Sequence, residues 1–364
     1  MNWIYLTWIF LSAKDGYLAQ MKKISQKAKL RFLRKWISIE KRLYKSRVLR
    51  ETGKTTPKTS FIAPSYFSLN GPERKKLVSF IKDIRDSIVS GSRAIFIDFR
   101  QTQKFIADGT LLFYAEMDRL LDHHPTLTIR CMQPFNKKAS QVLQQIGFYK
   151  RIGKTVKESV CDHDDVISWR VARGQGAVGE QYDKILGHYD GIITEALQSE
   201  LYTGLTEAMT NAHHHAYISQ RGDGIRSSPS YKPWWMFSQE KAGMLTVVFC
   251  DLGVGIPGSL PHSSDEGWKR WWAVMRRLGM HTRGDANVIR GAIRHSRTRT
   301  QLHNRGKGLI QIVETIGAVD DGQAILQSNR GWYRIHARKE TIDDYKLSIM
   351  GTIIFWQMPL EARP

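Results

Sequence analysis

One stretch in the second half of the chain constrains its fold most strongly. Met244–Cys250 reads MLTVVFC, with Thr246 as its single polar residue, and it leads directly into Asp-Leu-Gly-Val-Gly at 251–255. An apolar run of this length, bounded by glycines, predicts a buried strand. Asp251, Gly253 and Gly255 then predict a tight turn at its end, in which bare backbone can pass close to a ligand.

A second polar feature lies upstream of this strand. Helical patterns run over 182–197 and 201–217, and Glu207 and Asn211 are four positions apart, on one helical face. An amide oxygen is a suitable Mg²⁺ ligand, and a carboxylate can deprotonate a water or hydroxyl that attacks a phosphate. The same pair is also common on helix surfaces, so it indicates a functional site only when other sequence elements support it.

A third element is glycine-rich and precedes an apolar-periodic helix over 309–316. It reads Asn304, Arg305, Gly306, Lys307, Gly308, Leu309. Glycines before a helix expose backbone amides that bind phosphate oxygens with help from the helix dipole. The segment lacks the Gly-x-x-x-x-Gly-Lys-Ser/Thr pattern of a P-loop.

In this order and spacing, the three elements resemble the nucleotide site of the superfamily that joins gyrase, heat-shock chaperone, histidine-kinase and mismatch-repair ATPases. Asn211-Ala212-x-x-His215-Ala216 is most similar to the anti-sigma-factor serine kinases, and the run 351–360 resembles the family's last core strand. The resemblance covers 181–362 and implies the Bergerat ATP-binding fold, a two-layer α/β sandwich.

The resemblance also implies residue roles. Glu207 is the expected catalytic base, Asn211 the expected Mg²⁺ ligand, and Asp251 is expected to read adenine, which it can do by accepting a hydrogen bond from the amino group. The other expected ATP-binding residues are His215, Gly253, Gly255, Arg305, Gly306, Lys307, Gly308 and Leu309. The expected cofactors are ATP and Mg²⁺, with electrostatic positioning supplying most of the catalysis.

In that superfamily the segment between the glycine boxes is a lid over the phosphates. Residues 257–305 contain ten Lys and Arg against three acidic residues, a net charge of +7. Trp268, Trp271 and Trp272 in this segment either meet a partner, stack on a base or pack against the sheet, and packing is the commoner outcome. The run 213–215 of three histidines is not expected to bind a metal, because consecutive helical residues point about 100° apart.

The region before this one alternates between strand and helix patterns. We expect strands over 61–69, 93–99 and 127–131, and helices over 72–89, 109–122 and 137–146. The fold class predicted for the whole chain is therefore mixed α/β. Its expected domains are 59–157 and 181–362, joined by a polar, glycine-rich connection over 158–180.

The region 59–157 resembles the STAS domain, which sulfate transporters share with antagonists of anti-sigma factors. The resemblance rests on the strand ending at Asp98-Phe99, the turn 105–112 into a helix, and Gly147-Phe148. In phosphorylatable members a Ser or Thr stands at the helix start. Here the turn reads Asp108-Gly109-Thr110, and we expect Thr110 to cap the helix rather than to accept phosphate.

Positive charge concentrates near the amino terminus. Residues 22–58 contain fourteen Lys and Arg against two Glu, which is +12 of the total net charge of +21. The apolar side chains of this segment repeat at helical spacing, so we expect a basic amphipathic helix within 1–58. This helix is either solvated or in contact with a polyanion such as nucleic acid, an anionic membrane or an acidic protein.

Two features bear on location. The apolar run 3–11 is too short to span a bilayer, so no transmembrane helix is expected. Either Met21 is the true start instead of Met1, or the first twenty residues are a short hydrophobic anchor. Cys131, Cys161 and Cys250 lie far apart, without the spacing of a disulfide framework or a zinc site, which favours a reducing cytoplasm.

Two functional hypotheses follow. The first is an ATP-dependent enzyme that hydrolyses ATP or phosphorylates Ser or Thr of a protein partner in a bacterial-type regulatory system. A sensor histidine kinase is not expected, because the helix over 182–197 offers only His188 as an acceptor. The second is a nucleotide-gated regulator or nucleic-acid-binding module without turnover, which the basic segments 22–58 and 257–305 favour. A homodimer is also expected from the superfamily, although no residue specifies it.

Overall fold

The computed structural model describes residues 59–156, 163, 166, 169–175, 195–262, 266–279, 284–300, 313, 316–317 and 319–360. Residues 57–364 form one compact unit and residues 1–56 another, and all described residues belong to the former. The basic helix expected within 1–58 and the glycine-rich residues Arg305–Leu309 lie outside the described residues.

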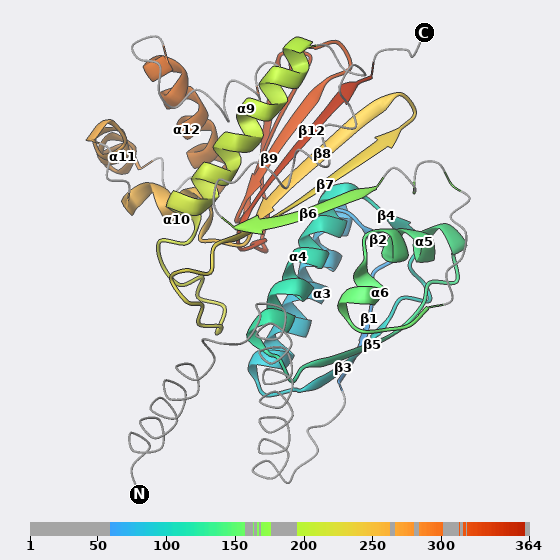
Figure 1. Cartoon of the computed structure of the whole chain (residues 1–364). Helices are drawn as coiled ribbons and strands as arrows, with labels where there is room; N and C mark the ends of the chain where they lie inside the picture. The colour runs from blue at the N-terminus through green and yellow to red at the C-terminus, as the bar shows by residue number, and fades with distance from the viewer. Residues whose placement is uncertain are drawn as a thin grey trace, which may run out of the picture. The chain divides into compact units, whose positions relative to one another are not determined.

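A small parallel sheet and its helices make up the upstream region (Figure 1). The strands β1 (Thr59–Ile62), β3 (Ala94–Asp98) and β5 (Thr128–Met132) pair in parallel in the order β1-β3-β5. Two short strands, β2 (Tyr66–Phe67) and β4 (Lys104–Phe105), also pair in parallel. The helices are α3 (Gly71–Val89), α4 (Ala107–His123), α5 (Lys137–Gln145) and α6 (Phe148–Arg151).

The expected elements of this region occur, with shifted boundaries. The strand expected over 61–69 is divided into β1 and β2 around Pro64, which has no N–H group for a sheet ladder. Gly147 ends the α5 segment in a left-handed conformation with φ of 75°, which glycine adopts without strain. Helix α4 begins two residues before the expected start, at Ala107.

The downstream region is built on a seven-stranded sheet in the order β11-β10-β9-β12-β8-β7-β6, antiparallel throughout. Its strands are β6 (Arg170–Gln175), β7 (Pro233–Lys241), β8 (Met244–Asp251), β9 (Gln323–Ser328), β10 (Gly331–His336), β11 (Lys339–Asp344) and β12 (Thr352–Pro359). Strand β6 falls within the segment 158–180, which we expected to be a connection. Among the described strands, β7 is its one neighbour, so β6 stands at the edge of the sheet, and its sequence carries little strand pattern.

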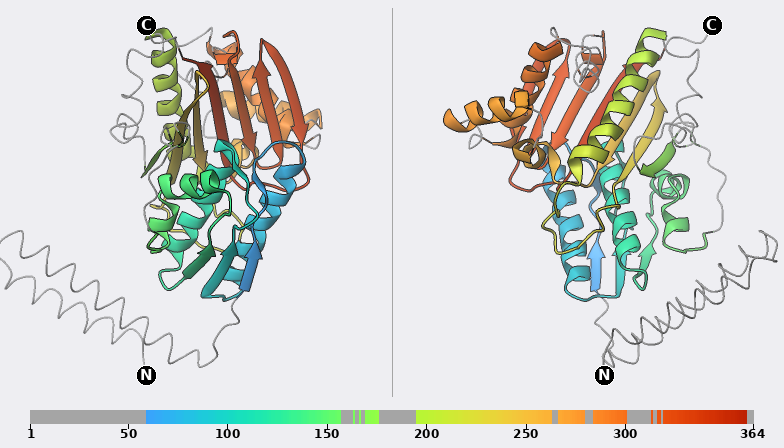
Figure 2. Two further views of the ribbon diagram at one scale, coloured as in Figure 1. Left: turned by 90° about the vertical axis from the view of Figure 1, so that its right-hand side faces the viewer. Right: turned by 60° about the vertical axis from the view of Figure 1, so that its left-hand side comes forward.

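Helices lie on one face of this sheet (Figures 1 and 2). They include α9 (Glu195–Asn211), the π-helical turn η3 (Ala212–Ala216), α10 (Gly255–Ser259) and α12 (Asp285–Thr300). The 3₁₀ turn η4 (Leu260–His262) and α11 (Glu266–Arg277) lie farther out, with α11 beside α12. A mixed α/β architecture, with parallel strands upstream and a separate antiparallel sheet downstream, is thereby confirmed.

The central strands β7, β8, β9 and β12 of the seven-stranded sheet are buried on both faces. On β7, Trp234 and Met236 belong to the apolar core that includes α9 residues, whereas Trp235 and Phe237 belong to the core that includes α3 and α4 residues. Helix α4 contacts β7, β8 and β12. Because alternate side chains of a strand point to opposite faces, a strand covered on both sides needs apolar residues at nearly every position, as in Met244–Cys250. The two expected domains thus share a core.

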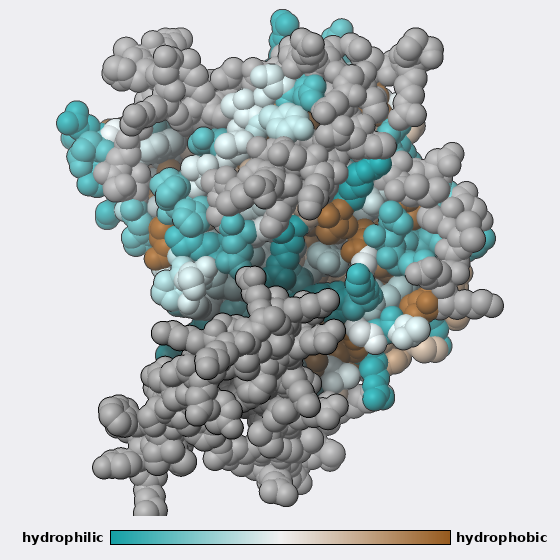
Figure 3. Space-filling model, viewed as in Figure 1, coloured by the Kyte–Doolittle hydropathy of each residue, from teal (hydrophilic) through white to brown (hydrophobic). Residues whose placement is uncertain are grey.

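The exposed surface carries fewer features that indicate a function than the core and the turns do. In Figure 3 hydrophilic residues predominate on the described part of the face shown, and apolar residues form small, separate groups. Among the described residues, no helix is both long and apolar enough to cross a membrane. Cys131 and Cys250 are buried free thiols.

Candidate functional site

Helix α9 presents Glu207 and Asn211 at its carboxyl end. Its residues Leu205 and Met209 pack into the core against the sheet, while Glu207 and Asn211 are half-buried beside that packed face. Asn211 Nδ2 donates a hydrogen bond of 3.3 Å to Glu207 Oε1. Because the amide nitrogen is used in this bond, the amide oxygen is the atom left for a cation.

The three histidines form the π-helical turn η3 directly after Asn211. Such turns are rare and occur often at functional sites. The rings of His213 and His214 meet edge to face at 4.9 Å, and Lys232 Nζ donates to the His213 carbonyl at 2.8 Å. His215 is exposed. Across the described part of the chain, no group of three or more His, Cys, Asp or Glu is arranged to hold a metal ion.

Asp251 is the last residue of the central strand β8, where it pairs with Trp234 of β7 and Thr352 of β12. Its Oδ1 accepts a 3.0 Å hydrogen bond from the Gly253 amide, and the Thr352 side chain supplies another. Only 6% of Asp251 is exposed. Burial opposes the charged form and raises the pKa of this carboxyl from 3.8 to about 6.

Gly253 brings the Asp251 turn against the end of the helical segment. A Cβ on Gly253 would lie 2.1 Å from the Ala216 carbonyl oxygen, and the neighbouring Val254 amide donates to that same oxygen at 2.8 Å. Only a glycine permits so close an approach of two backbones. Two of the three sequence elements are therefore in direct contact in the fold.

This contact gives a stability prediction. We expect Gly253→Ala to lower the free energy of unfolding by about 1–3 kcal/mol, because the new methyl group collides with rigid backbone rather than with a flexible side chain. Gly258→Ala is the matched control, since its Cβ would meet only the Val254 side chain, at 3.1 Å. Urea denaturation measures both, and equal stabilities of the two variants would contradict the proposed close approach.

Tyr217 links the same two segments and was not expected from the sequence. Its hydroxyl donates to the Pro233 carbonyl at 2.5 Å and accepts from the Leu252 amide at 3.0 Å. Burial raises the pKa of Tyr217 well above its usual value, and the neighbouring charge of Asp251 raises it further. The phenol therefore stays neutral and fixes the turn beside Asp251.

Gly255 has a φ of 75°, and a Cβ there would lie 2.6 Å from Asn329 Nδ2. Asn329 Nδ2 donates to the Val254 carbonyl at 2.8 Å, and Ser328 Oγ accepts from the Ile256 amide at 2.8 Å. Neither residue was expected from the sequence. Ser328 is the last residue of β9, and Asn329 lies in the turn after it. The sequence of this segment has no recognisable strand pattern, and its role became clear only from the pairing of β9 with β12.

Thr352 is a fourth residue of the site that was not expected from the sequence. Its hydroxyl lies 3.2 Å from Ser328 Oγ and also hydrogen-bonds the Asp251 side chain. The signal that could have found it is its place in Gly351-Thr352, at the start of the strand that resembles the family's last core strand.

The basic segment expected as a lid is largely helical. Trp271 stacks on His295 at 5.4 Å and Trp268 meets the same ring edge to face at 4.7 Å, so these tryptophans pack on α12. The positive side chains of α11 are exposed: Lys269, Arg270, Arg276 and Arg277. The structure thus favours packing for Trp268 and Trp271, against a helix rather than against the sheet.

In the turn that resembles the STAS phosphorylation site, the position of Thr110 differs from the one we expected. The cap of α4 is Ile106, and Thr110 stands one turn inside the helix, fully buried, where its hydroxyl donates to the Ile106 carbonyl at 2.6 Å. The prediction of an N-cap at Thr110 is wrong because α4 begins earlier. Buried Asp108, whose pKa burial raises to about 6, accepts bonds from the amides of Gly109 and Leu69.

No known protein-family model and no curated protein sequence matches this chain. The segment that carries Glu207, Asn211 and His215 contacts the turn after Asp251 at one point, where Ala216 meets Gly253 and Val254. The remaining expected residues, Arg305–Leu309, lie outside the described residues.

Proposed function

We propose that this chain binds ATP with Mg²⁺ in the manner of the gyrase, chaperone and histidine-kinase superfamily, and that it hydrolyses ATP or transfers its terminal phosphate to Ser or Thr of a protein partner. The observation that carries this proposal is the contact between the Ala216 carbonyl and the turn after Asp251. It puts a buried carboxylate at a strand end beside the helix end that bears a carboxylate and an amide.

Asp251 suits the recognition of adenine. Its carboxylate is held by the Gly253 amide and Thr352, so its position is fixed before a ligand arrives. An ionised carboxylate only accepts hydrogen bonds, which matches an exocyclic amino group and rejects a carbonyl at that position. This arrangement supports a preference for adenine over guanine.

Asn211 and Glu207 suit the phosphate end of the site. The Asn211 amide oxygen is a hard, neutral ligand of the kind that Mg²⁺ takes, and the hydrogen bond to Glu207 orients it. A bound Mg²⁺ would offset negative charge on the phosphates. Glu207 would accept the proton of the attacking water or hydroxyl, and the glycine-rich residues Arg305–Leu309 would supply amides and positive charge to the phosphates.

A nucleotide-gated regulator without turnover is the second candidate. It is favoured by the exposed cations of α11 and by the shared core, through which a change at the nucleotide site would reach the STAS-like region. The charge of 22–58 and 257–305 would then serve a nucleic acid or another polyanion.

Incubation of the purified chain with ATP labelled at the terminal phosphate tests the proposal. Parallel samples contain Mg²⁺ or EDTA, and DNA, RNA or neither. Mg²⁺-dependent release of free phosphate indicates hydrolysis, and labelled protein indicates phosphotransfer. Mg²⁺-dependent ATP binding with neither product supports the regulator. Absence of ATP binding under all conditions contradicts both candidates.

A further inference from the structure

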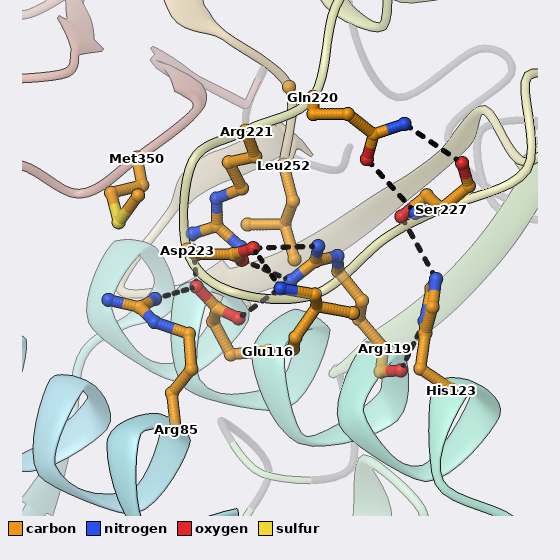
Figure 4. Close-up of polar contacts among 12 residues, drawn as sticks. Arg85, Glu116, Arg119, His123, Gln220, Arg221, Asp223, Ser227, Leu252 and Met350 are labelled. Atoms are coloured by element: carbon orange, nitrogen blue, oxygen red, sulfur yellow. Dashed lines mark hydrogen bonds and ion pairs between the residues drawn. The ribbon is translucent and has the colours of Figure 1, made fainter. Parts of the chain in front are cut away.

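A buried network of charges joins helix α4 to the loop 217–232, which follows η3 (Figure 4). In Figure 4 the guanidinium groups of Arg85, Arg119 and Arg221 converge on the carboxylates of Glu116 and Asp223. Arg85 donates to Glu116 at 2.8 Å, and Arg119 donates to Asp223 at 2.6 Å. Arg221 pairs with both carboxylates and therefore bridges the two halves of the network.

The network is as buried as the apolar core. The Arg221 side chain is 4% exposed, that of Glu116 1% and that of Asp223 0%. Burying ions costs so much desolvation energy that such a network is poor evidence for stability, and apolar side chains would fill the space as well. A role that an apolar group cannot fill is to hold a charge at a defined place.

The network is not neutral by itself. Its three guanidinium groups and two carboxylates leave one positive charge, and the Nε atom of Arg221 has no hydrogen-bond partner among the described residues. The positive charge of Arg221 lowers the pKa of its ion-pair partners Glu116 and Asp223, and it also lowers that of Asp251, where it acts after burial and the hydrogen bonds from Gly253 and Thr352. The charge of Arg221 is therefore felt both within the network and at the end of β8.

Arg221 also holds the backbone that lies against Asp251. Its Nη2 donates to the Ile349 carbonyl at 3.3 Å. Two residues further on, a Cβ at Gly351 would lie 2.3 Å from the Asp251 carbonyl oxygen, and Thr352 follows with its bond to the Asp251 side chain. Arg221 thus reaches Asp251 both through charge and through the segment 349–352.

We infer that Arg221 is a positioning residue for the Asp251 carboxylate, and that helix α4 of the STAS-like region sets the position of Arg221 through Glu116. This inference rests on the proposed nucleotide site. It means that a helix outside the proposed nucleotide site helps to set the placement of the carboxylate that is proposed to bind adenine. A change in α4 would therefore alter nucleotide affinity.

The test follows the titration of Asp251 in the ligand-free protein by NMR of ¹³C-labelled aspartate carboxyl groups, with Asp251→Asn identifying the signal. The groups around Asp251 are Tyr217, Cys250, Thr352 and Arg221. In the unmodified chain we expect a midpoint near the pKa of about 6. Arg221→Met removes a nearby positive charge, so it should raise the midpoint by about half a pH unit or more.

Two further variants separate positioning from general loosening. Glu116→Gln leaves the charge of Arg221 less neutralised, so it should lower the Asp251 midpoint, opposite in sign to Arg221→Met. Arg119→Met removes an equally buried guanidinium of the same network that has no bond to Ile349, and it should move the midpoint clearly less than Arg221→Met does. If Arg221→Met does not fold, a downward shift of the Asp251 midpoint in Glu116→Gln still supports the inference. An unmoved midpoint in Glu116→Gln, or equal shifts in both arginine variants, would overturn the inference.

The affinity for Mg²⁺-ATP, measured against pH in the same variants, connects the titration to function. We expect the pH at which half of the affinity is lost to move with the Asp251 midpoint. If the unmodified chain binds no ATP, the proposed function fails, whereas the NMR titration still decides the role of Arg221. If ATP binds and the midpoints do not move, the inference fails and the proposed function stands.

Discussion

Replacing Glu207 by Gln is expected to reduce ATP turnover by about 10²–10⁴-fold, the range that a positioned general base contributes. Gln keeps the oxygen that accepts from Asn211 Nδ2 and fits the same half-buried position, so the fold and ATP affinity should persist. Phosphate release or phosphoprotein formation measures turnover, and equilibrium binding of labelled ATP measures affinity. Glu207→Ala should give the same result if the carboxylate is the base.

Thr203→Ala is the matched control on the same helix. Thr203 is exposed one turn before Glu207, and its hydroxyl is bonded to the Ser199 carbonyl of its own helix. This variant should keep normal turnover. Normal turnover in Glu207→Gln as well would show that Glu207 is not the base.

Asp251→Asn should change function and stability in opposite directions. Loss of a charge-assisted hydrogen bond to adenine is expected to raise the Kd for ATP by about 10- to 100-fold. The same substitution should raise the stability of the ligand-free protein at pH 8. Asn keeps an oxygen that can accept from Gly253, while it removes a carboxylate that the fold keeps away from water.

The sign of the stability effect follows from the pKa of Asp251. The folded value of about 6 lies above the ordinary 3.8, so between these two pH values the folded protein binds more protons than the unfolded chain. The free energy of unfolding therefore falls as pH rises through this window and stays lower above it. The shift corresponds to about 3 kcal/mol, an upper bound for the gain in Asp251→Asn at pH 8. Below pH 4 the gain should vanish, as thermal melts at both pH values will measure.

Asp108 provides the control for this experiment. It is a second buried carboxyl whose pKa is raised to about 6, but it lies at the start of α4, away from the residues assigned to ATP. Asp108→Asn should raise stability at pH 8 in the same way and leave the Kd for ATP unchanged. Equal loss of ATP affinity in both variants would contradict the role of Asp251, since it would point to a general effect of removing buried charge.

Much of the fold could be predicted from the sequence where a signal is local. Helix α3 repeats Leu77, Ile81, Ile84 and Ile88 on one face, and β8 is a continuous apolar run, so both were expected close to their observed bounds. Strands β6, β7, β9, β10 and β11 were not expected. Of these, β6 and β11 are edge strands rich in polar residues, and they exist because a neighbouring strand offers hydrogen bonds.

The candidate site likewise contains residues with a local sequence signal and residues without one. Asp251 and the glycines after it could be found because a carboxylate behind a buried strand and glycines in a turn are each rare patterns. Tyr217, Asn329 and Arg221 could not be found, because a tyrosine, an asparagine and an arginine in loops carry no periodicity. Their roles arise from partners far away in the sequence, such as Glu116 for Arg221.

The sequence by itself determined the strand that ends at Asp251, the helix with Glu207 and Asn211, and the mixed α/β class, because apolar periodicity and glycine placement act over a few neighbouring residues. Only the tertiary structure decided that the two elements touch at Ala216, and that α4 covers the second face of the sheet. Contact between distant segments depends on the packing of whole faces, and so does the burial that raises the pKa of Asp251.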